Sequence, residues 1–290
     1  MPEPTPAAPA SCAAGLPTDD GITLLDVHKS FGDNHVLRGL TLHIERGKTT
    51  VIVGGSGTGK SVTLKHMVGL LKPDRGRVIV DGEDITDYDR DQLIRVRRKF
   101  GYLFQSAALI NWLTVFENVA LPLRELTRMP EHEIEQRVME KLTLLHVEKA
   151  RDRTPPEISG GMKKRVGLAR ALIWDPTFVL YDEPTSGLDP IMTAAVDQMI
   201  IETRDKTGVT SVVVSHDMAS ARRIADKIVL LFKGRLIFEA PPDEFMNSDN
   251  PYVRQFVRGE LHGPITGDAA ATDDESAAAA AEPAGGNHTS

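Results

Sequence analysis

The residues with the clearest chemical pattern lie at 54–61, where the chain reads GGSGTGKS. This run fits the phosphate-binding pattern G-x-x-x-x-G-K-[ST], with its glycines, lysine and hydroxyl in place. An apolar run before it predicts a strand, and the spacing after it predicts a helix. A helix N-terminus directs free N–H groups and partial positive charge toward one point, which suits an anion. A glycine turn without a ligand is the alternative, but the Lys-Ser pair in this context favours a phosphate site.

Each side chain of such a loop has its own task. Lys60 is expected to reach the β- and γ-phosphates of a nucleotide, and the Ser61 hydroxyl to ligate Mg²⁺. The residues expected to surround the nucleotide in this loop are consecutive: Gly54, Gly55, Ser56, Gly57, Thr58, Gly59, Lys60, Ser61 and Val62.

A second candidate element, TFVLYDE at 177–183, is a buried-strand pattern that ends in two carboxylates. Asp182 is placed to hold Mg²⁺, directly or through water, opposite Ser61. Glu183 suits a general base that polarises an attacking water, a role typically worth ~10²–10⁴ in rate. Alone, the pair could be solvated carboxylates at a strand-to-turn junction. A phosphate loop with one aspartate also leaves kinases, GTPases and helicases open.

A third element supplies another glycine turn. Residues 157–162 read EISGGM and precede a basic helical stretch. Ser159, Gly160 and Gly161 put a small polar side chain and free N–H groups at a predicted helix start, which makes a second anion-binding site. One chain rarely needs two such sites for one nucleotide. The run resembles the signature motif of the ATP-binding cassette (ABC) family, usually written LSGGQ.

Further residues match ABC motifs in the family's order. Phe31 resembles the aromatic residue that stacks on adenine, with a core or edge-strand phenylalanine as the alternative. Gln105 in GYLFQ resembles the Q-loop glutamine, which touches Mg²⁺ or water and senses the transmembrane partner. Residues 186–189 resemble the D-loop. His216 resembles the switch histidine that contacts the γ-phosphate, although a histidine beside Asp217 could be an ordinary surface pair.

The resemblance covers about residues 21–260 and implies both a fold and an assembly. The fold is α/β, a P-loop NTPase (RecA-like) core with an antiparallel β subdomain and an α-helical signature subdomain. Two copies would bind ATP and Mg²⁺ in a head-to-tail sandwich, with Ser159–Gly161 of one facing the γ-phosphate held by the other. The implied catalytic residues are Lys60, Gln105, Glu183 and His216. The implied Mg²⁺ ligands are Ser61, Gln105 and Asp182.

Two signature positions depart from the usual pattern. Ile158 replaces Leu, which is conservative. Met162 replaces Gln and removes an amide that both donates and accepts hydrogen bonds. The signature often reads LSGGM in the ATPases of Mce-type (Mla-like) lipid transporters, so Met162 fits that subgroup. The runs at 68–85 and 251–265 also resemble it, with a generic amphipathic C-terminal helix as the alternative for the second run.

That subgroup implies lipid transport, of phospholipid in our reading, through permease partners in the inner membrane with an Mce-domain lipid-binding protein. The sequence leaves open the lipid, the direction of transport and whether a small regulatory subunit takes part. The chain would then be a peripheral protein on the cytoplasmic face. Just after Gln105, four apolar residues are candidates for the permease interface, or equally for a subdomain core. They are Leu109, Trp112, Leu113 and Phe116.

Two rival functions stay open. The ATPases of polar amino-acid importers are the nearest subgroup that could be confused with this chain. Non-transport ABC proteins of the DNA-repair type insert a long coiled coil before the signature. Here only about 100 residues separate Lys60 from Ser159, and they contain no heptad run. Translation-associated types carry two cassettes in one chain, whereas this chain has one.

The apolar pattern predicts the elements that must position these residues. Short apolar runs at 49–53, 177–181, 210–214 and 228–232 predict buried strands of a mostly parallel sheet. The stretches on either side of Gly32–Asn34 read as strands bordering a turn, which predicts a small antiparallel layer. Residues 106–175 have few strand signals, so we expect a helical subdomain there.

The two ends of the chain differ in composition from its centre. Residues 1–20 and 263–290 are rich in Pro, Ala and acids, which predicts disordered tails around a domain at 21–262. Removing the eight acids of residues 1–20 and 264–290 from the total of 41 leaves 33 acids against 34 Lys and Arg. This balanced charge lacks the excess of basic residues that is typical of nucleic-acid-binding domains, so we expect no nucleic-acid partner.

Cysteine content and apolar runs indicate the cellular compartment of the protein. The single cysteine, Cys12, excludes an internal disulfide. The N-terminal residues lack the basic and apolar regions of a signal peptide. The apolar runs fall far short of the ~18 residues that read as a membrane span. We therefore expect a cytoplasmic protein.

Overall fold

The computed structural model describes residues 20–267, which contacts divide into two compact units with a boundary between Pro242 and Asp243. The predicted N-terminal tail lies outside the described residues up to residue 19, and the predicted C-terminal tail does so from residue 268. Residues 20–267 contain no candidate membrane-spanning helix.

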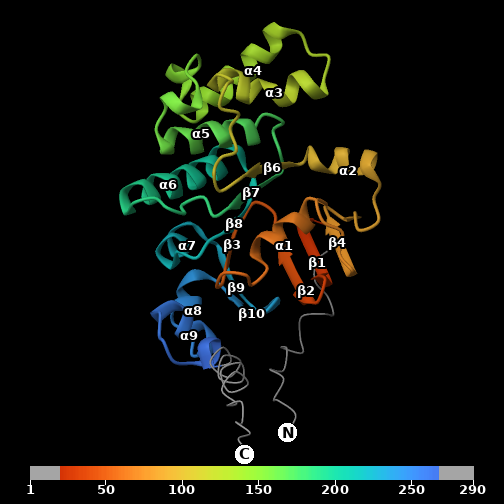
Figure 1. Cartoon of the computed structure of the whole chain (residues 1–290), viewed down its shortest axis with the longest axis vertical. Helices are drawn as coiled ribbons and strands as arrows, with labels where there is room; N and C mark the ends of the chain where they lie inside the picture. The colour runs from red at the N-terminus through yellow and green to blue at the C-terminus, as the bar shows by residue number, and fades with distance from the viewer. Residues whose placement is uncertain (1–19, 268–290) are drawn as a thin grey trace, which may run out of the picture. The chain divides into compact units, whose positions relative to one another are not determined.

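The larger sheet of the first unit has the strand order β10-β9-β3-β8-β7-β6 (Figure 1). Its strands are β3 Thr49–Val53, β6 Phe100–Leu103, β7 Phe178–Asp182, β8 Thr210–Val214, β9 Lys227–Phe232 and β10 Arg235–Ala240. All neighbours pair in parallel except β9 and β10. The four strands predicted from apolar runs are therefore present. The sequence reasoning did not predict β6 or β10, whose apolar patterns are short.

A smaller antiparallel sheet has the order β2-β1-β4-β5, as the sequence predicted for its first two strands. Its strands are β1 Ile22–Phe31, β2 Asn34–Ile44, β4 Arg75–Val80 and β5 Glu83–Asp84. Apolar side chains from this sheet form one core with the buried side chains of the larger sheet and of the helix after β3. Fully burying each such aliphatic side chain is worth roughly 1.5–3 kcal/mol.

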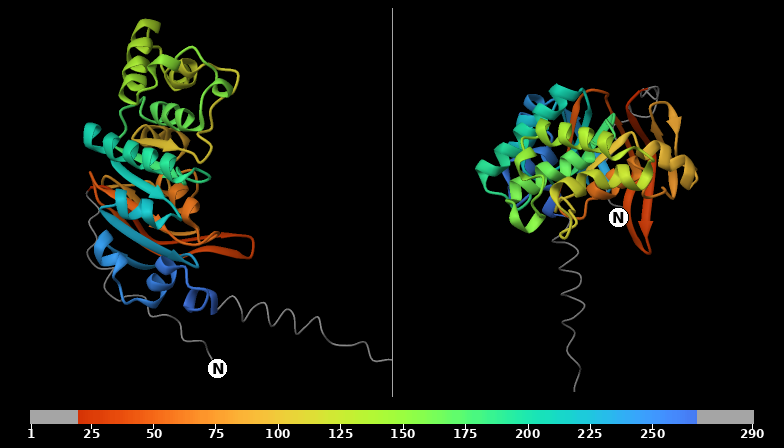
Figure 2. Two further views of the ribbon diagram at one scale, coloured as in Figure 1. Left: turned by 90° about the vertical axis from the view of Figure 1, so that its left-hand side faces the viewer. Right: turned by 90° about the horizontal axis from the view of Figure 1, so that it is seen from above.

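The helices are α1 Lys60–Met67, α2 Arg90–Arg97, α3 Val115–Leu126, α4 Glu131–Leu144, α5 Gly160–Ala171, α6 Pro190–Thr207, α7 Met218–Ile224, α8 Pro242–Met246 and α9 Pro251–Arg258. Short 3₁₀ turns occur at Glu148–Ala150 and Pro155–Glu157. Figure 2 shows α3, α4 and α5 together at the end of the first unit that lies away from β9 and β10. This helical group falls within residues 106–175.

Local sequence explains where several helices begin. Thr114 and Glu117 form a reciprocal capping box at the start of α3. Ser159 caps α5, and Asp189 caps α6, where Pro190 follows at the first helical position. The polar residues at these starts satisfy N–H groups that a helix leaves without partners.

The second unit, from Asp243, contains most of α8 and all of α9. Asn250 caps α9, and Gly259 ends it in the left-handed conformation. The amide of Gln255 bonds to the Glu260 carbonyl and the Thr266 hydroxyl. Residues 264–267, assigned by sequence to the tail, begin a helical turn.

Parallel pairing brings the functional segments to one edge. The carboxyl ends of four neighbouring strands carry them: the loop after β3, Asp182 and Glu183 at the end of β7, His216 after β8 and Gln105 after β6. In open α/β sheets this edge is where ligands bind.

Candidate functional site

The loop after β3 depends on glycine at two points. Gly54 has φ 153°, and a Cβ there would lie 2.3 Å from the Leu231 carbonyl oxygen. Gly59 has φ 100°, and a Cβ there would lie 2.7 Å from a Leu37 methyl carbon. Side chains at either position would push the loop away from the strands that support it. The Thr58 hydroxyl closes the loop by donating to the Gly55 carbonyl at 2.9 Å.

Lys60 is the buried cation of this loop. Its ammonium donates to the carbonyl oxygens of Gly54 at 2.9 Å and Gly55 at 2.8 Å, and the residue is only 6% exposed. The ammonium also lies 4.0 Å from Glu183 Oε1. Burial lowers the pKa of Lys60, and the neighbouring carboxylates of Glu183 and Asp182 partly offset that effect. The charge is thus held inside the loop, where a phosphate would meet it.

Ser61 and Asp182 meet as the sequence predicted. The Ser61 hydroxyl donates to Asp182 Oδ1 at 2.8 Å, and the Tyr102 hydroxyl donates to Asp182 Oδ2 at 3.0 Å. Burial, and then the Asp182 charge, raise the pKa of Tyr102, so its hydroxyl stays a donor. Tyr102 lies on β6, beside β7, and the sequence reasoning missed it because it had not predicted β6.

The oxygen atoms of Ser61 and Asp182 fit the ligand preference of Mg²⁺. Among residues 20–267, no group of three or more His, Cys, Asp or Glu side chains could hold a metal ion. A Mg²⁺ at this point would instead use one hydroxyl, one carboxylate and phosphate oxygens, which is how Mg²⁺ is usually held beside a phosphate substrate.

Glu183 connects the two sides of this cluster. Its Oε2 lies 3.4 Å from His216 Nδ1, while its other oxygen, Oε1, makes the 4.0 Å contact with Lys60. Its backbone N–H donates to the Val214 carbonyl at 3.0 Å while φ is 48°. A non-glycine residue in this region costs of order 1–3 kcal/mol, and such strain persists where the surroundings fix it. The neighbouring strand therefore holds the Glu183 backbone in one orientation.

Gln105 connects the loop after β6 to two other segments of the chain. Its side-chain amide donates to the Ser186 hydroxyl at 3.0 Å, and its backbone carbonyl accepts from the Lys164 ammonium on α5. Within the described residues, its side chain makes no hydrogen bond to Ser61 or Asp182. The Gln105 contact instead links the loop after β6 to the segment before α6.

Two cations on α5, the buried Lys164 and the half-buried Arg170, hold Gln105 and the residues after it. Lys164 contacts the Gln105 carbonyl, and Arg170 donates to the carbonyls of Ala107 at 2.8 Å and Ala108 at 2.9 Å. Burial lowers the pKa of both Lys164 and Arg170. Sequence reasoning had assigned these residues only to a basic helical stretch, because nothing in that pattern shows which loop the helix contacts.

The signature turn differs from the phosphate loop. The Ser159 hydroxyl accepts from the Met162 N–H at 3.3 Å, so it caps its own helix. A Cβ at Gly160 would meet nothing within 4 Å, whereas one at Gly161 would lie 2.3 Å from the Met192 methyl carbon. Ser159 and Gly160 are exposed. In the described part of the chain, no hydrogen bond or ion pair joins Ser159–Gly161 to the phosphate-loop cluster.

Phe31 is the last residue of β1, and the structure leaves it 49% exposed. The Lys29 ammonium lies 5.7 Å from the centre of its ring. A core role for Phe31 is thus not what the structure shows, and its aromatic face remains accessible.

The apolar residues after Gln105 divide into two groups. Trp112 is 81% exposed, whereas Phe116 is buried on α3 beneath the guanidinium groups of Arg124 and Arg151. Leu109 and Leu113 are half-buried. Trp112 therefore keeps its place as an interface candidate, and Phe116 belongs to the core of the helical group.

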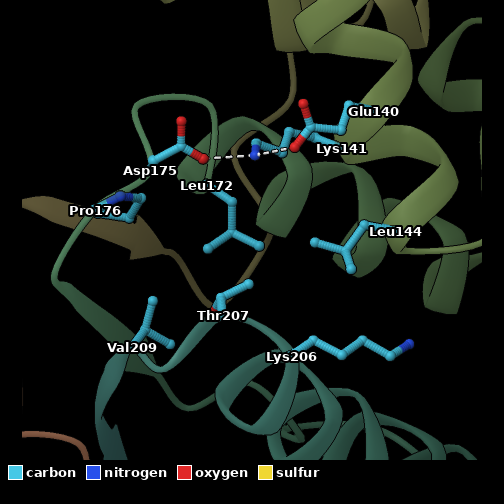
Figure 3. A pocket seen from close by; sticks show the side chains of 9 residues that line it. All are labelled: Glu140, Lys141, Leu144, Leu172, Asp175, Pro176, Lys206, Thr207 and Val209. Carbon is cyan, nitrogen blue, oxygen red and sulfur yellow. Dashed lines mark hydrogen bonds and ion pairs between the residues drawn. The ribbon is translucent and has the colours of Figure 1, made fainter.

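A separate cavity of about 490 Å³ lies between α4, the turn before β7 and the end of α6 (Figure 3). Its lining comprises Glu140, Lys141, Leu144, Leu172, Asp175, Pro176, Lys206, Thr207 and Val209. The Lys141 ammonium contacts both Glu140 and Asp175, and these hydrogen bonds outweigh burial and raise the pKa of Lys141. The lining includes none of the predicted site residues, and its buried cation is already paired.

Comparisons with known proteins agree with this geometry. A family model described as "ABC transporter" matches residues 37–186. The probable ribonucleotide transport ATP-binding protein mkl of Mycobacterium tuberculosis is 43% identical over 89% of this chain and 72% of that protein. The intermembrane phospholipid transport system ATP-binding protein MlaF of Escherichia coli is 37% identical over 84% of this chain and 91% of that protein.

A solved structure resembles the chain at a similar level. It is the dimeric structure of a post-hydrolysis state of the ATP-binding cassette MJ0796, bound to ADP and Pi. The two share 35% identity with a TM-score of 0.69, over 76% of this chain and 98% of that one. The similarity confirms the predicted fold class.

Proposed function

Because the chain belongs to the ABC transporter family of ATPases, we propose that it is the subunit that couples ATP hydrolysis to phospholipid transport through a partner permease. The observation that carries this proposal is the match to MlaF over 91% of that protein's length. Met162 in the signature, which the resemblance associates with Mce-type lipid transporters, supports the same subgroup.

The phosphate loop would bind the triphosphate of ATP. The N–H groups of residues 54–62 and the Lys60 ammonium supply positive charge at this point, and Phe31 offers a ring for the adenine. Ser61 and Asp182, with Gln105, would hold Mg²⁺. When bound, this ion neutralises charge on the β- and γ-phosphate oxygens.

Hydrolysis would depend on the pair formed by Glu183 and His216. Glu183 would orient the attacking water and accept its proton, because its carboxylate lies beside the loop and its backbone is fixed by Val214. His216, 3.4 Å from that carboxylate, would steady the γ-phosphate. The contact with Lys60 keeps the base close to the loop that holds the substrate.

The signature turn would serve a nucleotide held by a second copy. Ser159 and Gly160 are exposed and Gly161 is half-buried at the N-terminus of α5, and within residues 20–267 none of the three bonds to the phosphate-loop cluster. ABC cassettes dimerise, as the MJ0796 structure shows. We place Ser159, Gly160 and Gly161 against the γ-phosphate of the partner's ATP, so binding of ATP would favour the closed dimer.

The expected partners follow from the transport role. The exposed Trp112 and the loop that follows Gln105 would receive the permease at the cytoplasmic face of the inner membrane. An Mce-domain protein would deliver or receive the lipid, and a small regulatory subunit would complete the complex. No nucleic acid is expected as a partner.

The substrate class is where the relatives differ, because mkl is named for probable ribonucleotide transport and MlaF for phospholipid transport. We favour phospholipid because of Met162 and the extent of the MlaF match. A polar amino-acid importer is not favoured by either relative.

The test is to purify the ATPase with its membrane partners in a mild detergent and to identify bound small molecules by mass spectrometry. We expect phospholipid in the complex, and ATPase activity that changes when phospholipid vesicles replace detergent. A complex that retains a ribonucleotide other than ATP or ADP, with activity indifferent to lipid, would contradict the proposal. The Glu183→Gln complex, purified in parallel, shows whether bound lipid depends on turnover.

A further inference from the structure

One carboxylate is buried away from the site. Asp197 on α6 is fully buried, and it is the only Asp or Glu among the buried residues of the described chain. Burying a carboxylate is costly unless hydrogen bonds and an opposite charge compensate it. A side chain retained under these conditions requires a specific set of partners.

Both partners of Asp197 lie on α7. The Ser220 hydroxyl donates to Oδ1 at 2.5 Å, and the Arg223 guanidinium donates to Oδ2 at 2.5 Å. Burial raises the pKa of Asp197, while the bonds from Ser220 and Arg223 act in the opposite direction. The carboxylate thus joins α6 to α7, two helices that pack together in Figure 1.

The first turn of α7 is continuous with the segment that carries His216. Asp217 caps the helix by accepting from the N–H groups of Ala219 at 2.8 Å and Ser220 at 3.1 Å. The Asp217 N–H in turn donates to the Ser215 hydroxyl at 3.0 Å. A shift of α7 would therefore move the backbone on both sides of His216.

Asp197 also lies on the helix that follows Ser186 and Asp189, the segment before α6. Asp189 caps α6 by accepting from the N–H groups of Ile191 and Met192. Ser186, three residues before this cap, accepts the Gln105 amide. Asp197 lies two turns into the same helix, so it links this segment to the one that carries His216.

We propose that Asp197 is a positioning residue, which holds α7 against α6 and thereby sets the position of His216 relative to Glu183. The inference rests on the proposed role of His216 in ATP hydrolysis. Asp197 touches neither nucleotide nor water in this account and acts only through His216.

A double-mutant cycle tests the proposal on the full chain. Asp197→Asn, His216→Ala and the double variant are compared for kcat and KM of ATP hydrolysis, with thermal unfolding as the measure of folding. We expect Asp197→Asn to lower kcat about tenfold with KM changed less than about twofold, as for coupled neighbours. In the His216→Ala background the same substitution should change kcat less than about twofold. Asp205→Asn makes the same carboxylate-to-carboxamide change at an exposed position of the same helix. It is the matched control and should retain activity.

Each outcome bears on the proposal. If Asp197→Asn leaves kcat unchanged, or if its effect multiplies with that of His216→Ala, Asp197 does not act through His216 and the proposal is overturned. If His216→Ala itself retains near-normal kcat, the assigned role of His216 fails as well, which separates the two failures. If Asp197→Asn does not fold, Ser220→Ala, which removes one bond to Asp197, replaces it in the cycle with the same expectations.

Discussion

The phosphate loop and the signature turn both place glycines at a helix N-terminus, yet they differ in their contacts with the rest of the chain. At the loop, Lys60, Ser61, Asp182 and Glu183 are buried or half-buried and contact one another. At the turn, Ser159 caps only its own helix and Gly160 faces open space. One region is supported from within the chain, and the other is accessible to a second copy. We infer that a single chain carries halves of two different sites.

The largest expected effect falls on the loop side. Glu183→Gln removes the proposed base but keeps the shape of the side chain, so ATP should still bind while kcat falls by at least ~10². Steady-state phosphate release and equilibrium ATP binding measure the two quantities. Glu202→Gln, at a half-buried glutamate on α6 that pairs with Lys206, is the control. Near-normal hydrolysis by Glu183→Gln would refute the base assignment.

The next effect distinguishes binding from chemistry. Lys60→Ala removes a buried ammonium and its charge-assisted bonds to phosphate, so ATP affinity should fall roughly 10- to 100-fold. Isothermal titration measures this affinity, with Lys65→Ala, an exposed lysine on the same helix, as the control. Equal affinity in Lys60→Ala and the parent would mean that the loop does not hold the triphosphate.

A smaller effect on binding is expected at the signature turn. Gly160→Asp adds a Cβ that would meet no more distant part of the chain within 4 Å, so the monomer should fold and bind ATP within about twofold of the parent. The new charge should oppose the partner's γ-phosphate and suppress hydrolysis. Gly160→Ala, which adds bulk without charge, should retain more activity. Loss of ATP binding by monomeric Gly160→Asp would mean that the signature turn contacts the nucleotide of its own chain. That result would contradict the difference proposed between the loop and the turn.

The sequence alone predicted the candidate residues that a short local pattern identifies. Gly54 to Ser61 are consecutive, from the loop after β3 to the first turn of α1, and Asp182 ends an apolar strand, so in both cases a short stretch of sequence contains the whole pattern. Pairs between distant elements were not predictable. Tyr102 reaches Asp182 only because β6 pairs with β7, and a four-residue strand leaves too little periodicity to recognise. Lys164 likewise contacts Gln105 through helix packing that no local pattern encodes.

The apolar residues after Gln105 show the same limit on prediction. Their spacing allowed either an interface or a core, and the structure assigns opposite environments to Trp112 and Phe116. Burial depends on how α3 packs against α5, which is a property of the assembled helices. The spacing of apolar residues predicts which of them share a helix face, but whether that face is buried depends on how the helices pack.

The most direct test of the central claim is a cross-link between two chains. In a Cys12→Ser, Glu183→Gln background, Ser56→Cys and Ser159→Cys variants are mixed and treated with a short bismaleimide. We predict a heterodimer that forms only with ATP and Mg²⁺, because the phosphate loop of one copy faces the signature turn of the other. Absence of that product in folded, ATP-bound protein, or an equal yield without ATP, would contradict the shared site.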